Sequence, residues 1–173
     1  MTVAVDATSL AFLVNPDAGT SIDPETNLPV PRVADRVRLL ISDISKSKGR
    51  VIIPAPALAE VLVKAEDGGA ELINILHNAS VFLVAPFDQM AAIELAAMTR
   101  DALAAGGKKG GHSGEWQKVK LDRQICAIAK LHRAERFYTD DENLAKFARK
   151  VGMAVFGTKD LPLPLEPERD LFS

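Results

Sequence analysis

Short apolar runs of strand length alternate with longer stretches in which apolar residues recur every three or four positions. The short runs are mostly rich in β-branched residues and lie at residues 2–5, 51–53, 81–84, 137–139 and 153–156. Because parallel strands need crossover connections, this alternation predicts an α/β fold. We expect a central parallel sheet of about five strands in a three-layer α/β/α arrangement. The periodic stretches predict helices at residues 7–14, 32–44, 56–66, 70–78, 88–105, 122–134 and 142–151.

Two segments break this pattern and are predicted as loops. Residues 15–31 are rich in Pro, Asp, Asn and Gly and show no period that could bury one face. Residues 106–120 begin with the glycine-rich sequence GGKKGGHSG. Neither loop is long enough to separate two domains. We therefore expect one domain over residues 1–158 that carries both loops as insertions, and then a proline-rich tail over residues 159–173.

Composition and charge exclude several classes of protein. The chain of 173 residues has a formal net charge of -2, so any contact with nucleic acid must be local. Its one cysteine, Cys126, excludes an internal disulfide framework, and with three histidines it gives no zinc-type spacing. The first residues lack the basic region of a signal peptide, and no apolar stretch approaches membrane-spanning length. These features predict a cytoplasmic protein with no membrane contact.

Acidic residues follow two of the predicted strands. Asp6 comes directly after the first strand, and Asp140 and Asp141 follow the strand at 137–139. In a parallel sheet, reacting groups collect at the carboxyl ends of the strands, so these acids are expected to share one edge. The alternative for each is a helix cap or a turn residue, because aspartate favours both positions.

Two further acids lie on apolar helix faces. Glu60 is the polar residue within the otherwise apolar PAPALAEVLV, where an unpaired carboxylate would be costly. Asp122 leads the apolar stripe of its helix, with Ile125 and Cys126 on the same face. The alternatives are an exposed Glu60 and an Asp122 that is merely a first-turn acid favoured by the helix dipole.

Convergence of these acids would require compensation of their charge. Two carboxylates about 4 Å apart repel by about 4 kcal/mol at an effective dielectric of 20. Either the acids keep protons through raised pKa values, or divalent cations bind among them. An all-oxygen set suits Mg²⁺ or Mn²⁺, and acidic sites of this kind hold the ions with which nucleases hydrolyse phosphodiesters.

The four acidic segments occur in a characteristic order. They are VAVDATSL with Asp6, PAPALAEVL with Glu60, LDRQICAIA with Asp122, and FYTDDENLAKFARKVG with the fourth acid. No single segment is specific, but the ordered set covers most of the chain and resembles the PIN-domain ribonucleases. Many of these are the toxins of VapC-like toxin–antitoxin pairs. In that family the fourth acid stands two places after the threonine, which points to Asp141, with Asp140 as the alternative.

The resemblance implies a PIN-like fold and an Mg²⁺- or Mn²⁺-dependent endoribonuclease. Asp6, Glu60, Asp122 and Asp141 would hold the ions, with Thr8 and Thr139 as supporting hydroxyls. The resemblance also implies a homodimer and a small antitoxin protein as partners. Compact members of the family have shorter loops than residues 15–31 and 106–120 of this sequence. A solitary nuclease, or a PIN-like binding module that does not cleave, would give the same sequence pattern.

Basic residues gather in and just after the second loop. They would lie beside the acids, where they could hold RNA phosphates while an aromatic ring stacks on a base. The alternative is a solvated loop whose tryptophan packs on the body of the protein. The candidate substrate contacts are Lys108, Lys109, Trp116, Lys118, Lys120 and Arg123.

Overall fold

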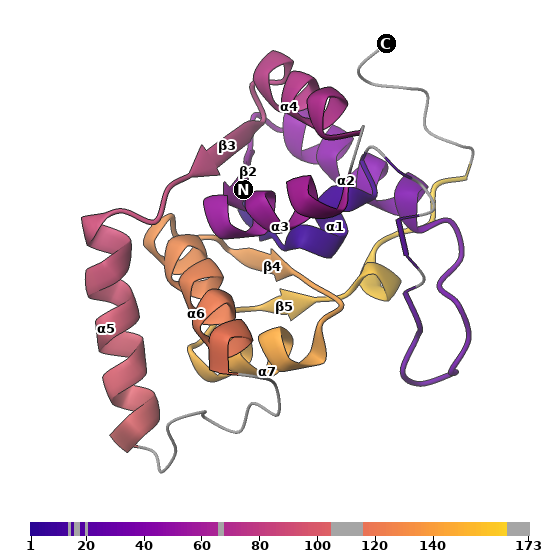
Figure 1. Cartoon of the computed structure of the whole chain (residues 1–173). Helices are drawn as coiled ribbons and strands as arrows, with labels where there is room; N and C mark the ends of the chain where they lie inside the picture. The colour runs from indigo at the N-terminus through magenta and orange to yellow at the C-terminus, as the bar shows by residue number, and fades with distance from the viewer. Residues whose placement is uncertain (14, 16–17, 20, 66–67, 105–115, 166–173) are drawn as a thin grey trace.

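Five parallel strands form the centre of the protein, as the sequence predicts (Figure 1). The computed structural model describes residues 1–13, 15, 18–19, 21–65, 68–104 and 116–165. The sheet has the order β3-β2-β1-β4-β5, so β1 lies in the middle and the chain builds outward from it in both directions. The strands are β1 (Thr2–Val5), β2 (Arg50–Pro54), β3 (Phe82–Ala85), β4 (Arg136–Tyr138) and β5 (Val155–Phe156).

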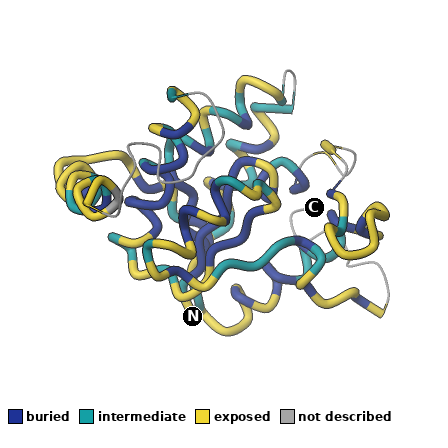
Figure 2. Tube along the Cα trace, turned by 90° about the horizontal axis from the view of Figure 1, so that it is seen from below, coloured by how far each residue is buried: buried dark blue, intermediate teal, exposed yellow. Residues whose placement is uncertain are grey.

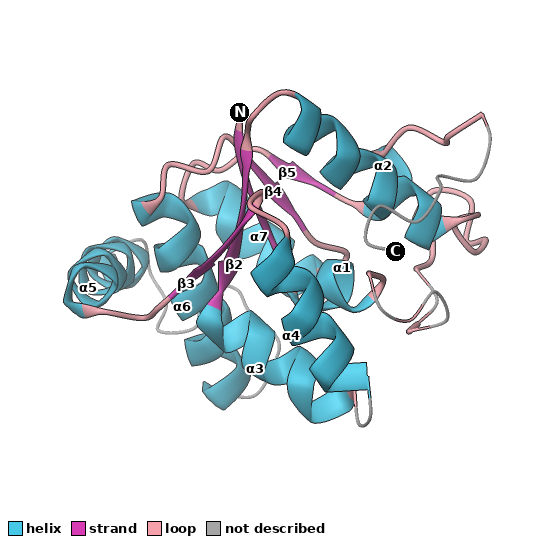
Figure 3. Ribbon diagram, turned by 90° about the horizontal axis from the view of Figure 1, so that it is seen from above, coloured by secondary structure: helices cyan, strands magenta, loops and turns pink. Residues whose placement is uncertain are grey.

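Helices cover both faces of this sheet. Helices α2 and α6 both contact β2, and Figure 3 shows them on opposite sides of the sheet. Helix α5 lies farther out and packs against α6. This confirms the expected three-layer arrangement. The helices are α1 (Ala7–Ala11), α2 (Val33–Lys46), α3 (Ala55–Lys64), α4 (Gly69–Asn78), α5 (Gln89–Ala104), α6 (Trp116–Leu131) and α7 (Glu142–Lys150), with a short 3-10 helix η2 (Thr158–Asp160).

The apolar pattern explains these layers. The central strands are buried on both faces, and residues 51–53 of β2 have almost no exposed surface, as expected for a parallel sheet covered on both sides. In α2 the predicted apolar face is also buried: Val37, Leu40, Ile41 and Ile44 all belong to the core.

Several predicted boundaries were wrong. Helix α6 begins at Trp116 and not at Asp122, because buried Val119 extends its apolar face toward the N-terminus and the intervening residues are acceptable helix formers. Helix α1 ends at Ala11 instead of residue 14, and β5 is reduced to Val155–Phe156. The early start of α6 places Trp116, Lys118 and Lys120 on a helix, whereas the sequence pattern had placed them in a loop.

The first inserted segment is tied to the C-terminal part of the domain. A single antiparallel bridge joins Ile22 to Pro29, and Lys159 of η2 forms ion pairs with Asp23 and Glu25. On α2, the helix that follows this segment, the Arg36 guanidinium also donates a hydrogen bond to the carbonyl oxygen of Leu161. Although no helix or longer strand forms in the described part of the segment, it is therefore held against the domain.

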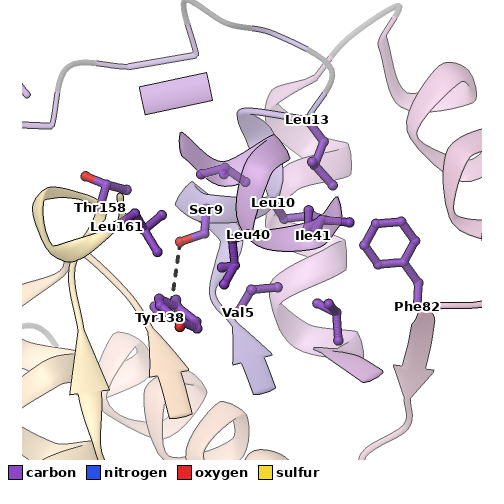
Figure 4. Close-up of a pocket in the computed structure, with 12 residues that line it drawn as sticks. Val5, Ser9, Leu10, Leu13, Leu40, Ile41, Phe82, Tyr138, Thr158 and Leu161 are labelled. Carbon is purple, nitrogen blue, oxygen red and sulfur yellow. Dashed lines mark hydrogen bonds between the residues drawn. The ribbon is translucent and has the colours of Figure 1, made fainter. Parts of the chain in front are cut away.

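Between α1, α2 and the sheet lies a small cavity of about 10 Å³, lined mostly by apolar side chains (Figure 4). Val5, Leu10 and Ile41 line it, and the Ser9 hydroxyl on its margin donates a 3.5 Å hydrogen bond to the carbonyl oxygen of Tyr138. A space of this size holds about one water molecule. It is a packing gap in the core and offers no room for a substrate.

Among the described helices and strands, α5 carries the most exposed large apolar side chains. Figure 2 shows it mostly exposed, and Met90, Ile93 and Leu103 each have about half of their surface open to solvent. None of the helices in the described ranges combines the length and apolar character needed to cross a bilayer.

Gly49 fixes the connection from α2 to β2, and its replacement tests this packing. A Cβ at this position would overlap the carbonyl oxygen of Met1 and approach Cγ2 of Ile44 to 2.9 Å. We expect Gly49→Ala to lower the free energy of unfolding by about 1–3 kcal/mol in urea denaturation. Gly19→Ala, where a Cβ meets open space, should change it by less than about 0.5 kcal/mol. Equal effects of the two substitutions would contradict this account.

Candidate functional site

The sheet order brings two chain segments together at the carboxyl ends of β1 and β4. These strands pair directly, with Val5 opposite Tyr138, and the Asp6 amide donates a 3.1 Å hydrogen bond to the carbonyl oxygen of Tyr138. From β1 the chain continues to β2 on one side, whereas β4 lies on the other. This is the topological switch point of the sheet, the place where ligands bind in open α/β folds.

Asp6 is the buried centre of this edge, with 3% of its surface exposed. It caps the N-terminus of α1, where Oδ1 accepts a 2.8 Å hydrogen bond from the Ser9 amide. Its other oxygen, Oδ2, accepts a 2.6 Å hydrogen bond from the Thr139 hydroxyl. Burial raises the pKa of Asp6 to about 6, although both hydrogen bonds oppose this shift. Asp6 therefore acts as a helix cap and also stands at the edge where the acids were expected.

Thr139 joins Asp6 to Asp141. The same hydroxyl that donates to Asp6 accepts a 3.0 Å hydrogen bond from the Asp141 amide. Asp141 caps α7, and its Oδ1 accepts from the amides of Asn143 and Leu144. Its Oδ2 accepts a 2.5 Å hydrogen bond from the Lys118 ammonium. Burial would raise the pKa of Asp141, but the Lys118 charge and the cap hydrogen bonds prevail and lower it below its usual value.

The Lys118 ammonium pairs with Asp141 and is also affected by the charges of two other acids. Its hydrogen bond to Asp141 is the main cause of its raised pKa, and the charges of Asp141, Asp122 and Glu60 add to the effect. Lys118 precedes Asp122 by four residues on α6, so the two side chains share one helix face. Lys118 therefore links α6, α3 and the N-terminus of α7 electrostatically.

Asp122 and Glu60 differ in their exposure. Asp122 is buried, with 4% of its surface exposed. Its charge, after burial itself, helps to raise the pKa of the Cys126 thiol, which is a buried part of the core. Glu60 is partly exposed on α3 and forms a 2.7 Å ion pair with Lys64 one turn later. The cost expected for an unpaired carboxylate at Glu60 is avoided by this pairing.

Asp140 faces away from its neighbour Asp141 and binds a different set of groups. Its Oδ2 accepts hydrogen bonds from the hydroxyls of Ser21, at 2.6 Å, and Thr158, at 2.8 Å. Its Oδ1 accepts a 2.7 Å hydrogen bond from the Thr158 amide. Asp140 thus ties the inserted segment to η2. It also lines a cleft of about 340 Å³ in which Lys146, Arg149 and Lys159 lie beside acidic side chains.

Of the expected substrate contacts that the structure describes, Lys118 lies beside an acid of this edge, whereas Lys120 and Arg123 lie beside Trp116. Lys118 joins the acids, whereas the Lys120 ammonium lies 5.5 Å from the centre of the Trp116 ring. Arg123 is buried, and its guanidinium carbon lies 5.5 Å from the Trp116 ring and 5.3 Å from the Phe147 ring. This burial argues against a phosphate contact by Arg123 and favours packing of Trp116 on the body of the protein.

Of three other predicted positions, the structure describes only Thr8. Thr8 is exposed on α1, where it lines a groove with Val61 and Lys64. Lys108 and Lys109 lie outside the described residues. Two residues that the sequence reasoning missed are Ser21 and Thr158, the partners of Asp140. No pattern in the sequence marks them, because both are small polar residues in segments without a period.

The donor set consists of carboxylate oxygens, the ligands that hard divalent cations prefer. Within the described ranges, no three of the His, Cys, Asp and Glu side chains are close enough together to form a preassembled metal site. Lys118 brings positive charge to Asp141 and acts on Asp122 and Glu60, and Glu60 also pairs with Lys64. The oxygen donors are of the type that suits a divalent ion, but they are not preassembled around one position, and Asp141 is held by an ammonium group.

Comparison with known proteins supports the fold. No family model matches the sequence, and no curated protein matches it either. The structure of FitAB bound to an IR36 DNA fragment is similar over 94% of this chain and 99% of that chain, with 19% identity and a TM-score of 0.59. The structure of VapBC2 from Rickettsia felis bound to a DNA fragment from its promoter is similar over 91% and 98%, with 12% identity and a TM-score of 0.57. The chain therefore has the PIN-like fold.

The buried Asp6 carboxylate should make stability depend on pH in metal-free protein. Because its pKa rises from 3.8 to about 6 on folding, the folded state holds the proton more tightly, and stability falls as pH increases through this range. Asp6→Asn removes this loss and keeps a capping acceptor. In EDTA at pH 7 we expect the variant to be more stable than wild type by about 1–3 kcal/mol, with a flatter dependence between about pH 4 and 6 in urea denaturation.

Asp43→Asn is the control, because it removes the same charge from an exposed position on α2. Asp43→Asn should leave the pH dependence of the free energy of unfolding as it is in wild type. If Asp6→Asn were instead destabilised by several kcal/mol at all pH values, the carboxylate would serve only as a structural cap.

Removal of the Asp140 carboxylate should release the inserted segment. Asp140→Ala leaves the Ser21 and Thr158 donors without their acceptor, so we expect a loss of about 1–3 kcal/mol in the free energy of unfolding and faster amide exchange over residues 21–31. Glu142→Ala breaks only an exposed ion pair with Lys146. It should therefore change the free energy of unfolding and the amide exchange of residues 21–31 only slightly. Unchanged exchange in Asp140→Ala would show that this carboxylate does not hold the segment.

Proposed function

We propose that this protein is a metal-dependent endoribonuclease that hydrolyses RNA phosphodiester bonds. The observation that carries the proposal is the chain of contacts at the switch point of the sheet. Thr139 hydrogen-bonds to both Asp6 and Asp141, Lys118 pairs with Asp141, and the charges of Asp122 and Glu60 act on Lys118. These interactions involve four separate parts of the sequence and support the proposal, because the Asp6–Thr139–Asp141 part lies at the edge where an α/β sheet binds its ligands.

Asp6, Glu60, Asp122 and Asp141 are the residues that would hold Mg²⁺ or Mn²⁺. When bound, such an ion activates water and stabilises the charge that develops on the phosphate. We assign the fourth position to Asp141 instead of Asp140, because the oxygens of Asp140 accept hydrogen bonds from Ser21 and Thr158. Asp141 faces the side on which Lys118 and Asp122 lie.

The protein's own residues would orient these carboxylates and the RNA. Ser9 and Thr139 each bind one oxygen of Asp6 and fix its direction. Lys146 and Arg149 line the cleft that begins at Thr139 and Asp140, where they could contact the phosphates of a strand that reaches the acids. With a net charge of -2, such local cations are the means by which the protein would bind RNA.

We further propose that the protein is the toxin of a type II toxin–antitoxin pair. The segments that resemble VapC-like toxins and the shared fold with VapBC2 support this. Exposed apolar side chains on α5, among them Met90 and Ile93, offer a surface that a protein partner or a second copy could cover. The alternatives are a solitary nuclease and a PIN-like module that binds RNA without cleaving it.

Cleavage of RNA by the purified protein tests the activity. We expect cleavage with Mg²⁺ or Mn²⁺ and none after addition of EDTA. Asp122→Asn should reduce the rate by more than about a hundredfold, because it removes a charged ligand, while Asp43→Asn on α2 should cleave like wild type. Cleavage that persists in EDTA would reject the metal mechanism, and RNA binding without cleavage would favour the binding module.

A further inference from the structure

A lysine pairs with one acid of the candidate site and is affected by the charges of two others. The Lys118 ammonium donates a 2.5 Å hydrogen bond to Oδ2 of Asp141. The charges of Asp122 and Glu60 also act on it. Lys118 thus brings positive charge to the place where divalent ions were expected.

The position of Lys118 on α6 distinguishes it from the other lysines nearby. Lys118 lies on the same helix face as Asp122, four residues earlier. Lys120, two residues away on the same helix, instead lies over the Trp116 ring. Lys64 pairs with Glu60 within α3 and is more exposed than Lys118, at 69% against 52% of the side chain.

We propose that Lys118 is a tethered counter-ion that holds Asp141 until a divalent cation displaces its ammonium group. This inference rests on the proposed function, because it concerns the same carboxylates. Lys118 and a metal ion would need the same oxygen, Oδ2 of Asp141, since Oδ1 already accepts two hydrogen bonds from the α7 backbone.

Displacement is physically accessible. About half of the Lys118 side chain is exposed, so its ammonium can regain water as it leaves. A partly exposed ion pair of this kind stabilises weakly, whereas two cations beside one carboxylate repel each other. Lys118 therefore lowers the repulsion among the acids in metal-free protein and weakens metal binding by a moderate factor.

Metal affinity of the full-length chain tests the proposal without any measurement of cleavage. In calorimetric titration with Mn²⁺ alone, Lys118→Met should lower the dissociation constant by about three- to tenfold, since the metal no longer competes with an ammonium group. Lys118→Arg retains the charge and should bind Mn²⁺ no more tightly than wild type. Lys120→Met, the matched control on the same helix, should leave the Mn²⁺ affinity unchanged.

Thermal unfolding gives a second readout. In EDTA, Lys118→Met should unfold at a lower temperature than wild type, because Asp141 loses its ion-pair partner and Asp122 and Glu60 lose a nearby positive charge. With saturating Mn²⁺ the difference should disappear, because the metal then supplies the charge. Lys120→Met should not show this metal-dependent recovery.

The outcomes separate this inference from the proposed function. If wild type binds Mn²⁺ and cleaves RNA but Lys118→Met has the wild-type affinity or a weaker one, the counter-ion role is overturned and the nuclease stands. If Lys118→Met binds Mn²⁺ more tightly but no form cleaves RNA, the counter-ion role stands and the nuclease fails. If neither wild type nor Lys118→Met binds Mn²⁺, both are overturned.

Discussion

The pairing of β1 with β4 is the constraint on which the rest of the structure depends. It extends one residue beyond the strands, through the hydrogen bond from the Asp6 amide to the carbonyl oxygen of Tyr138, and so sets Asp6 beside Thr139. The Thr139 hydroxyl then donates a hydrogen bond to the Asp6 carboxylate and accepts one from the backbone amide of Asp141, and so connects residues from opposite ends of the chain. Because both strands are buried in the sheet, neither side chain can leave this position without disturbing the core.

The carboxylates at and near this edge also differ in the groups that surround their charge. Asp6 is buried beside two neutral donors, so its pKa rises to about 6. Asp141 has a lysine and two helix amides, and its pKa falls. Glu60 remains near solvent with Lys64. The same residue type thus has opposite pKa shifts at Asp6 and Asp141, because burial dominates at the first and an ammonium group with helix amides dominates at the second.

Adjacent residues can serve separate purposes at this edge. Asp140 and Asp141 are neighbours in sequence, but the first holds the inserted segment through Ser21 and the second faces Lys118. The insertion is therefore connected to the candidate site through one carboxylate. This links a segment whose described residues form one β-bridge and no helix to the residues that are proposed to carry the chemistry.

The sequence by itself determined the fold class, the α2 core face and the positions of Asp6 and Asp141 after their strands, because strand and helix periods are local properties of the chain. It did not determine the start of α6, since residues 116–121 carry a weak apolar period next to a glycine-rich stretch. Only the tertiary structure decided that Lys118 faces the acids, that Arg123 is buried, and that Asp140 binds Ser21 and Thr158. These contacts join residues far apart in the chain, and no local pattern records which distant donor will meet a given carboxylate.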